Sequence, residues 1–437
     1  MKIRAEKILV WSAILVFVLP VCAWAATYRV STATGVVDGT RFCGGTACTS
    51  ADKIIIQGGS RGNLVFQNFN GKGSYIVITN ENKNPDSRVI INNNSSLGLG
   101  ILSLTDCKYV DLRGNGDPDI TYGIKVINDG TPVVAGTVRV SGKSDHIKIG
   151  YIECAFDWNT TNSGNGIFVQ DGRLTNAWIW SNFEIHHNYI HDARYAGMYL
   201  GENKAATNDN PYVDSFSIHD NSIIDSGVYA MTYKSIHNSQ DNYIYNNIVK
   251  NTGVVSRPDL GPEFFKGITA HELYNDSKVY IYNNWIEKTY GSGIQAFSNF
   301  GANSAVYIHN NTIVGCGTGN DPKFGNGITF MVNSRNNQAY DNIIIQPKRY
   351  GIFTTQNNKS TPNNIMMRNK IGDAGIGEWG HYYNTGNLEE AKGANANIYH
   401  ADVADFGFKA WSDDGDYSND VFSSNKSTPP PKKLHIK

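Results

Sequence analysis

One motif recurs along this chain: a short strand of alternating apolar residues, a turn that carries asparagine, and a second short strand that opens with Gly-Ile or a close variant. Three copies read SIHDNSIIDSGVYAMTYK at 217–234, VYIYNNWIEKTYGSGIQAF at 279–297 and VYIHNNTIVGCGTG at 306–319. The turn asparagines are Asn188, Asn221, Asn247, Asn284, Asn311, Asn342 and, more weakly, Asn369. Their spacings vary from 26 to 37 residues, so constant strands alternate with loops of variable length. Short strands repeated at this period predict a β-solenoid.

The rest of the chain follows the same pattern. Short β-rich runs separated by Gly, Asn and Asp begin near Lys53, and helical periodicity is almost absent. On these motifs the chain resembles right-handed parallel β-helix proteins of the pectate-lyase-like superfamily over roughly residues 50–370. The resemblance implies an all-β solenoid with three short parallel sheets and an Asn ladder running from coil to coil. Parallel strands about 4.8 Å apart satisfy each other's backbone groups, and stacked amides add hydrogen bonds.

Four regions are predicted. Residues 1–25 read as a secretory signal peptide, because basic residues precede an apolar run that ends in the small-x-small site Ala-Trp-Ala. Residues 26–52 form an N-terminal cap, 53–371 the parallel β-helix, and 372–437 an irregular C-terminal region with a Pro-rich tail. The mature chain is therefore expected to be secreted, periplasmic or held at the cell surface. No later apolar run is long enough to span a bilayer.

The net charge and the cysteines indicate which partners and which redox compartment to expect. The formal net charge of −1 argues against a nucleic-acid partner, which would favour a basic stripe. In an oxidising compartment Cys43 and Cys48 are expected to close a small disulfide loop. Cys107, Cys154 and Cys316 lie in or beside strand patterns and are expected to be buried, although a Cys107–Cys154 bridge stays open.

Strand alternation sorts the side chains of the Gly-Ile sheet into columns. The first outward column is Phe168, Tyr199, Thr232, Thr269, Gln295, Thr329 and Phe353. The second is Gln170, Gly201, Lys234, His271, Phe297, Met331 and Thr355. Where the strands turn, a third follows with Asp171, Glu202, Ser235, Glu272 and Ser298. Acidic, basic and aromatic side chains thus converge on adjacent coils.

This convergence predicts a groove for an acidic polysaccharide, since aromatic faces pack on sugar rings and charged groups handle protons and carboxylates. The catalytic candidates are Lys234, His271 and Glu202. The substrate-binding candidates are Phe168, Tyr199, Phe297, Arg194 and Glu272. Asp171 and Glu202 are candidate ligands of a Ca²⁺ ion, a cation that prefers oxygen. The competing interpretation is an ordinary solvated face on which charges gather by chance.

Three functions remain open, and eliminative cleavage by a lyase is favoured. In that reaction Lys234 or His271 acts as base while cations neutralise the uronate carboxylate. A glycoside hydrolase is the alternative, because carboxylates on neighbouring coils would lie ~5 Å apart and those two coils apart ~9.6 Å. The Asn-Thr-Asp and Asp-Asp signature of polygalacturonases, the Asp-Pro-His-Asp motif of alginate epimerases and the Arg-x-Pro-x-x-Arg motif of pectate lyases are absent. A non-catalytic, surface or adhesive glycan-binding rod is the third reading.

A second stripe precedes the turn asparagines. Its predicted members are Lys148, His186, His219, Tyr245, Tyr282, His309 and Tyr340. These rings could bind glycan, but stacking on one another as ladder neighbours is favoured. A metal site formed by His186, His187 and His191 is disfavoured, because consecutive residues of an extended segment point to opposite sides.

Overall fold

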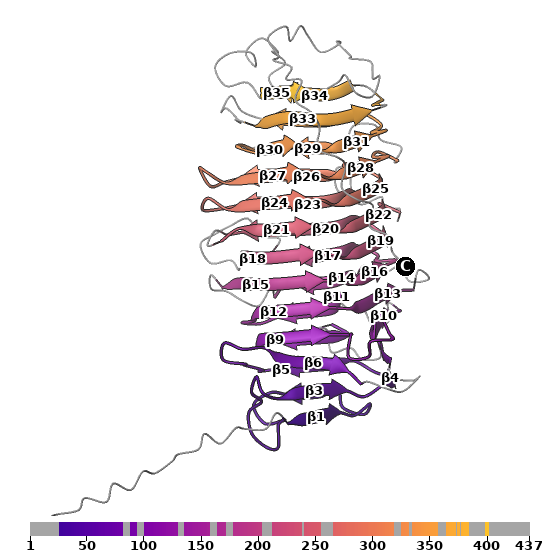
Figure 1. The fold of residues 1–437 in the computed structure, drawn as a ribbon, viewed down its shortest axis with the longest axis vertical. Helices are drawn as coiled ribbons and strands as arrows, with labels where there is room; N and C mark the ends of the chain where they lie inside the picture. The colour runs from indigo at the N-terminus through magenta and orange to yellow at the C-terminus, as the bar shows by residue number, and fades with distance from the viewer. Residues whose placement is uncertain are drawn as a thin grey trace, which may run out of the picture.

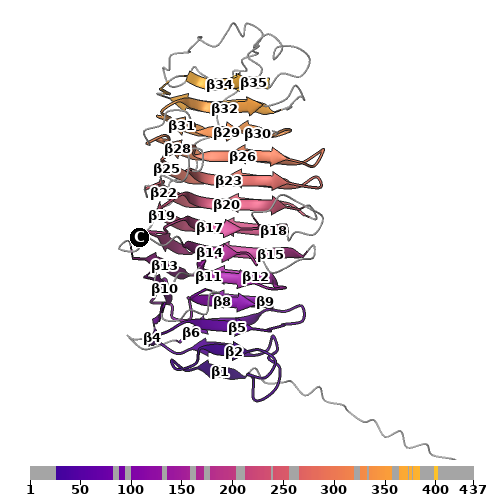
Figure 2. The same cartoon turned by 180° about the vertical axis from the view of Figure 1, so that it is seen from behind.

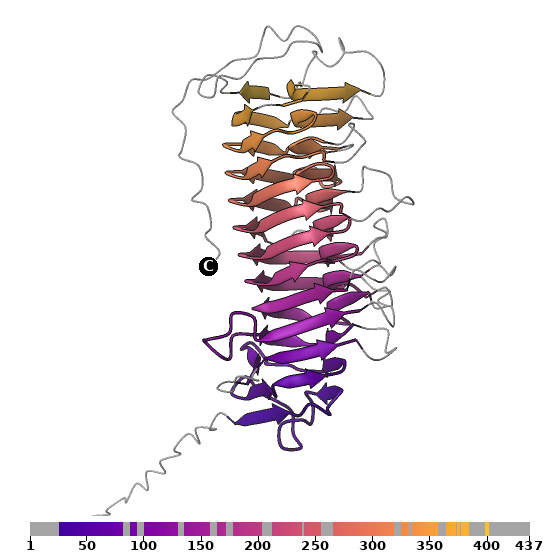
Figure 3. The same cartoon turned by 90° about the vertical axis from the view of Figure 1, so that its right-hand side faces the viewer.

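The computed structural model describes residues 26–401, apart from 82–87, 94–99, 130–134, 158–163, 172–177, 203–211, 238–239, 255–264, 319–324, 332–333, 357–363, 373, 376 and 384–397. The predicted signal peptide and the whole Pro-rich tail lie outside these residues. Figures 1 and 3 show the described strands stacked along one long axis. Each coil contributes short strands to three sheets, and the strand pairs of all three are parallel.

Sheet one contains the strand that precedes each asparagine turn, and neighbouring strands pair in the order given. Its strands are β1 (Thr27–Val30), β3 (Lys53–Ile56), β6 (Ile76–Asn80), β9 (Lys108–Arg113), β12 (Asp145–Gly150), β15 (Ile179–His186), β18 (Tyr212–His219), β21 (Asn242–Tyr245), β24 (Lys278–Tyr282), β27 (Ala305–His309), β30 (Gln338–Tyr340), β33 (Ile365–Gly372) and β35 (Ile398–Ala401).

Sheet two contains the Gly-Ile strands and is labelled along the centre of Figure 2. Its strands are β2 (Val36–Asp38), β5 (Leu64–Gln67), β8 (Leu102–Thr105), β11 (Gly136–Ser141), β14 (Asn165–Val169), β17 (Ala196–Leu200), β20 (Tyr229–Ile236), β23 (Lys266–Leu273), β26 (Ile294–Asn299), β29 (Ile328–Phe330), β32 (Tyr350–Gln356) and β34 (Gly377–Tyr383).

Sheet three contains the strand that directly follows the turn. Its strands are β4 (Gly59–Arg61), β7 (Val89–Asn92), β10 (Ile124–Asn128), β13 (Ile152–Phe156), β16 (Tyr189–His191), β19 (Ser222–Ser226), β22 (Ile248–Thr252), β25 (Trp285–Thr289), β28 (Thr312–Val314) and β31 (Ile343–Ile345). The long strand β33 pairs with both β30 and β31, and so joins sheets one and three in the last coils.

The core runs through the middle of the solenoid. Apolar side chains at alternate strand positions point inward and stack on the same position of the next coil, as Ile167, Met198, Met231 and Ile268 do with no exposed surface. Because each coil buries its apolar residues only against its two neighbours, stability is distributed along the rod.

The predicted Asn ladder is present. The side-chain amide of each ladder residue donates to the side-chain oxygen of the next one along the series Asn188, Asn221, Asn247, Asn284, Asn311, Asn342 and Asn369, at 2.9–3.0 Å. The residue before each ladder asparagine has a left-handed backbone, with φ between 52° and 55°. This conformation makes the corner between sheets one and three, and asparagine, aspartate and histidine tolerate it better than most residues.

The aromatic stripe also forms a ladder, as favoured from the sequence. Neighbouring rings of His186, His219, Tyr245, Tyr282, His309 and Tyr340 stack at 4.8–5.4 Å with interplanar angles of 12° or less. Lys148 does not belong to it: Lys148 pairs with Glu184, and Gly150 stands opposite His186. The ring faces pack against one another, so within the ladder they are not open for stacking on sugars.

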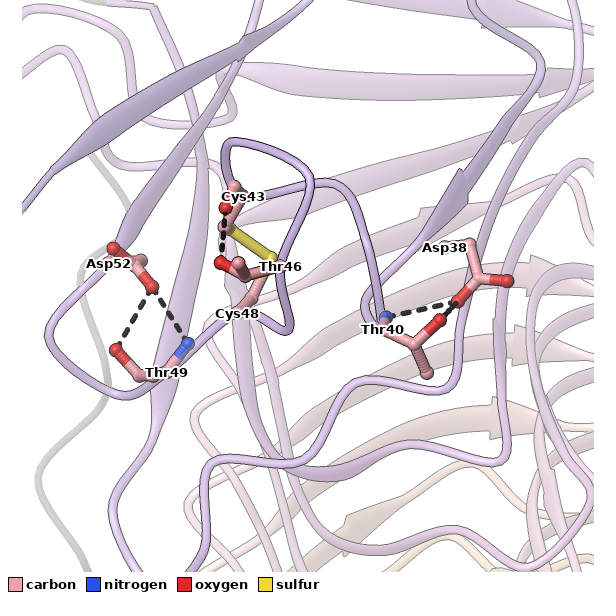
Figure 4. The surroundings of a disulfide bond; sticks show 7 residues. All are labelled: Asp38, Thr40, Cys43, Thr46, Cys48, Thr49 and Asp52. Carbon is pink, nitrogen blue, oxygen red and sulfur yellow. Dashed lines mark hydrogen bonds between the residues drawn. A yellow bond between two sulfur atoms is a disulfide. The ribbon is translucent and has the colours of Figure 1, made fainter.

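The stacked strands extend past the predicted limits of 53 and 371. Near the N-terminus β1 pairs with β3 and β2 with β5, so part of the expected cap already forms a coil. Near the C-terminus β32 pairs with β34 and β33 with β35. The predicted Cys43–Cys48 disulfide is confirmed (Figure 4), with Thr46 donating to the carbonyl of Cys43 inside its loop. Cys107, Cys154 and Cys316 are free and buried.

An ion network lies on the outer face of sheet three. Glu153 pairs with Arg88, with Lys125 at 2.6 Å and with His191 at 3.3 Å, and His191 also contacts Asp192 at 2.6 Å. Burial alone would raise the pKa of Glu153, but the contacts with His191, Lys125 and Arg88 outweigh burial and lower it to about 2. Three strands of different coils are thereby tied together.

This network predicts a pH-dependent stability. The pKa of Glu153 is lower in the folded chain than in the unfolded one, so its contribution is complete above the ordinary pKa and disappears as the pH falls from about 4.5 towards 2. We expect Glu153→Gln to lower the free energy of unfolding by about 2 kcal/mol at pH 7, after allowance for solvent screening. Urea unfolding of both proteins between pH 7 and 3 measures the difference.

The control for this prediction is Glu81→Gln, which removes a surface pair with the exposed Arg29. Such pairs contribute about 0–1 kcal/mol, so this variant should unfold like the wild type. A difference between Glu153→Gln and wild type that stayed constant from pH 7 to 3 would contradict the assignment.

Candidate functional site

The outer face of sheet two carries the first predicted column in the predicted register. Phe168 pairs with Tyr199, Tyr199 with Thr232, and Thr232 with Thr269. Gln295, Thr329 and Phe353 continue the column on β26, β29 and β32. The sequence alternation therefore placed these side chains on one line across seven coils.

The accessibility of this column differs from the expectation. Phe168 and Tyr199 are only 7% and 2% exposed, and their rings pack at 5.6 Å. Together with Tyr229 and Phe265 they form a second apolar cluster outside the main core. Tyr229 is the first residue of β20 and Phe265 directly precedes β23, so these four residues come from four successive coils. The two rings do not present the open faces that sugar stacking requires.

After Phe168 and Tyr199 the same column continues as a short polar strip. Thr232, Thr269 and Gln295 stand in register on β20, β23 and β26 and are 0–2% exposed. Their hydroxyl and amide atoms have no hydrogen-bond partner among the described residues. Buried polar groups are nearly always satisfied, so this strip has an unmet capacity for hydrogen bonds to water or to a ligand. Strand alternation predicts the place of these residues in the column, but no sequence signal indicates a role for them.

The second column supplies the half-exposed part of the face. Lys234 and His271 are paired positions on β20 and β23, and Phe297 follows on β26. The rings of His271 and Phe297 stack at 4.2 Å with an angle of 8°. The Nζ of Lys234 lies 5.8 Å from the ring centroid of Tyr199. The structure therefore brings two predicted catalytic residues and two predicted binding residues together.

The bend after these residues adds the third column. Ser235 and Glu272 have left-handed backbones, with φ of 55° and 62°. Because this conformation interrupts strand alternation, Glu272 stays beside its neighbour His271, with Oε1 3.2 Å from Nδ1, although not aligned as a hydrogen bond. Ser235 Oγ lies 3.3 Å from the carboxylate of Glu272 and 3.4 Å from the backbone oxygen of Glu202. Glu202, Ser235 and Glu272 thus lie on three successive coils.

The carboxylates of the two predicted calcium ligands, Asp171 and Glu202, accept hydrogen bonds from other residues of the fold. Glu202 accepts hydrogen bonds from the side chain of Gln170 at 2.7 Å and from the backbone N–H of Asp171 at 3.1 Å. Asp171 in turn accepts from the backbone of Gly142 at 3.0 Å. Each carboxylate therefore caps the preceding coil, and both residues are buried. These hydrogen bonds account for the placement of both carboxylates.

The electrostatics of the half-exposed group favour a neutral imidazole. Burial lowers the pKa of His271 against the opposing effect of Glu272, and the charge of Lys234 adds to the lowering. Burial also lowers the pKa of Lys234, opposed by Glu272. For Glu272 burial alone would raise the pKa, but His271 and Lys234 outweigh it and the pKa is lowered. Glu272 is therefore a carboxylate at neutral pH, while His271 is a free base.

Arg194 is the predicted site residue that stands apart. It lies in the turn before β17, whereas Lys234 and His271 lie near the ends of β20 and β23. In a stack of parallel strands these positions are at opposite ends of the sheet. The segments 172–177 and 203–211, which directly follow Asp171 and Glu202, lie outside the described residues. Among the residues the structure describes, no helix is long and apolar enough to cross a membrane.

Comparison with known proteins agrees with this architecture. Residues 263–371 match the family model described as "Right handed beta helix region". Together with the parallel stacking of three sheets, this match shows that the chain is a right-handed parallel β-helix protein, as predicted. No curated protein matches the chain.

Several solved structures resemble it at low identity. An alginate lyase from Paenibacillus sp. str. FPU-7 has 12% identity and a TM-score of 0.42, covering 82% of this chain and 98% of its own. The GH136 lacto-N-biosidase from Eubacterium ramulus has 11% identity and a TM-score of 0.41, with 82% and 68% covered. Pectate lyase Pel9A has 12% identity and a TM-score of 0.31, with 80% and 78% covered. Likeness of this size concerns the fold alone and transfers no reaction to the chain.

Proposed function

We propose that this chain is an exported enzyme that cleaves an acidic polysaccharide by β-elimination on the outer face of sheet two. The observation that carries the proposal is the juxtaposition of Lys234 and His271 in register on adjacent strands, with Glu272 3.2 Å from His271 Nδ1. Export is supported by the Cys43–Cys48 disulfide, which is typical of oxidising compartments, and by the predicted signal peptide.

Each of the three groups has a role that its surroundings favour. Glu272 beside Nδ1 favours the tautomer with its proton on that nitrogen, which leaves Nε2 of His271 as the base for the proton next to the uronate carboxylate. Lys234 supplies a positive charge one coil away, which neutralises the substrate carboxylate as negative charge develops. The proton taken by His271 is available for the departing glycosidic oxygen, so the bond breaks without added water. The ring of Phe297 holds the imidazole in place.

Calcium is not required by this arrangement. Because the hydrogen bonds to Asp171 and Glu202 explain their placement, no step is assigned to a bound ion, and calcium dependence stays a sequence prediction for experiment. Four other residues remain predicted members of the site: Phe168, Tyr199, Arg194 and Glu202. Phe168 and Tyr199 are buried, so we propose that they support the outer face of sheet two from within.

Hydrolysis by the same carboxylates has less support. A glycoside hydrolase needs one carboxylic acid with a raised pKa to protonate the leaving oxygen. Glu272 has a lowered pKa instead. Glu272 therefore does not supply the required acid.

The test is an assay of the exported protein on alginate, pectate, chondroitin and a neutral glycan. Elimination leaves an unsaturated uronate, so we expect ultraviolet absorbance to rise on one acidic glycan and not on the neutral one. Parallel measurements with added Ca²⁺ and with EDTA report calcium dependence separately. New reducing ends without absorbance would replace elimination by hydrolysis. Binding without either signal would favour a non-catalytic glycan-binding rod.

A further inference from the structure

A compact group of imidazole and carboxylate side chains lies on sheet one, away from the proposed groove. His186 and His187 end β15 and begin its turn, and His219 and Asp220 occupy the same two positions one coil later. One ligand-type atom from each of His187, His219 and Asp220 lies within 4.8 Å of the others. No other group of this kind occurs among the described residues.

The left-handed turns create this group. His187 and Asp220 have φ of 53° and 54°, so strand alternation ends there and consecutive side chains meet. His186 Nδ1 lies 3.0 Å from His187 Nδ1, and His219 Nδ1 lies 2.7 Å from Asp220 Oδ2. His186 and His187 were predicted to point to opposite sides if this segment is extended, and the segment is not extended at His187.

His191, the third histidine of the metal site that the sequence disfavoured, lies away from this group. His191 lies on β16 of sheet three, where it contacts Glu153 and Asp192. The structure therefore replaces His191 by His219 and Asp220 from the next coil. Sequence spacing did not show this substitution, because the two coils are separated by a loop of variable length.

The distances suit a small metal ion with nitrogen ligands. A tetrahedral ion bound at 2.0–2.1 Å holds its ligand atoms about 3.3 Å apart. The ligand atoms of His187, His219 and Asp220 lie within 4.8 Å of one another, and His219 Nδ1 is 2.7 Å from Asp220 Oδ2. The far nitrogen of His219 points to Glu184, at 3.4 Å, and Glu184 is held by Lys148 at 2.6 Å. A carboxylate behind the ligating histidine is the usual outer partner in such sites.

We propose that His187, His219 and Asp220 bind a divalent transition-metal ion, zinc in the first place. Imidazole-rich donor sets suit zinc, copper and nickel, whereas calcium prefers oxygen ligands. An ion held here links two adjacent coils at the corner between sheets one and three. It binds the folded chain and therefore stabilises it.

Equivalent turns in other coils indicate which substitutions the fold tolerates at this position. Later coils carry asparagine at the position of His187 and Asp220, namely Asn246, Asn283 and Asn310, each with φ of 54° or 55°. His187→Asn and Asp220→Asn thus convert the site into a corner that the chain already uses. The matched control is His309→Asn, which removes a ladder histidine flanked by Tyr282 and Tyr340 instead of ligands.

The experiment titrates the untagged exported protein with zinc chloride by calorimetry and follows its melting temperature with and without zinc. We expect saturable binding of one ion, and a melting temperature that rises with zinc and not with calcium. His187→Asn and Asp220→Asn should keep the wild-type circular dichroism spectrum. Each should bind zinc at least about 100-fold more weakly, since even outer partners of a metal site cost 10–100-fold.

Cobalt substitution provides an independent readout, because tetrahedral Co²⁺ has a visible spectrum that the two variants should lose and His309→Asn should keep. No saturable zinc binding by the wild type would overturn the proposal. So would zinc binding of equal strength in the wild type and His187→Asn, which would show that the ion binds at other histidines. Neither result bears on the glycan assay, because the site lies on a different sheet.

Discussion

Asn284→Ala should lower the free energy of unfolding by about 3–5 kcal/mol, an effect much larger than that of an average substitution. Asn284 is 1% exposed. Its amide donates to the carbonyls of Ile244 and Tyr282 and to the side chain of Asn311, at 2.9–3.0 Å. Its oxygen accepts from both the backbone and the side chain of Asn247. Alanine removes these five buried hydrogen bonds, each of which contributes about 0.5–1.5 kcal/mol net.

Urea unfolding followed by circular dichroism measures this loss. The matched control is Asn92→Ala, which removes a single surface hydrogen bond to Ser60 and should cost under about 1 kcal/mol. Because a solenoid coil depends on its neighbours, the ladder variant should also broaden the transition. Equal midpoints for Asn284→Ala and Asn92→Ala would show that the ladder contributes no stability beyond ordinary surface contacts.

Lys234→Ala should lower the rate of elimination by about a thousandfold while the melting temperature stays near that of the wild type. The estimate follows from the 10²–10³-fold effect of removing one preorganised group that stabilises developing charge. Lys234 is half-exposed, and its removal leaves Glu272 with Ser235 and His271 as contacts. Initial rates of ultraviolet absorbance on the responsive glycan provide the measurement.

Two further variants make this prediction specific. Lys234→Arg keeps the charge and should retain part of the activity if Lys234 neutralises the substrate, whereas an arginine cannot act as base. Lys250→Ala on sheet three removes a lysine paired with Glu287 at 3.3 Å and should leave the rate unchanged. Full activity in Lys234→Ala would exclude this face as the reaction centre.

The periodicity of the sequence was enough to predict the architecture. The seven asparagines, the strand pattern between them and the column from Phe168 to Phe353 were predicted in their observed register. One column member was misplaced. Lys148 belongs to a coil without a turn asparagine, in which Ile152 donates its backbone N–H to Asn188 instead, so the sequence offered no marker for the alignment of that coil.

The candidate site was predicted less completely, for two physical reasons. Phe168 and Tyr199 are buried in a cluster with Tyr229 at the start of β20 and Phe265 just before β23, which belong to other coils. The contact between His271 and Glu272 depends on a left-handed residue inside the strand. Neither a side-chain cluster that joins different positions of several coils nor an interruption of alternation leaves a periodic signal.

The sequence by itself thus determined the solenoid, its asparagine and aromatic ladders and the Cys43–Cys48 loop. In each case the interaction joins equivalent positions of neighbouring coils, or residues close in the chain, so spacing alone specifies it. Only the tertiary structure decided which outward side chains are covered, how Glu202 and Asp171 are used, and that His187 meets His219 and Asp220. These outcomes depend on backbone corners and on loops of unequal length, where position in the sequence no longer specifies position in space.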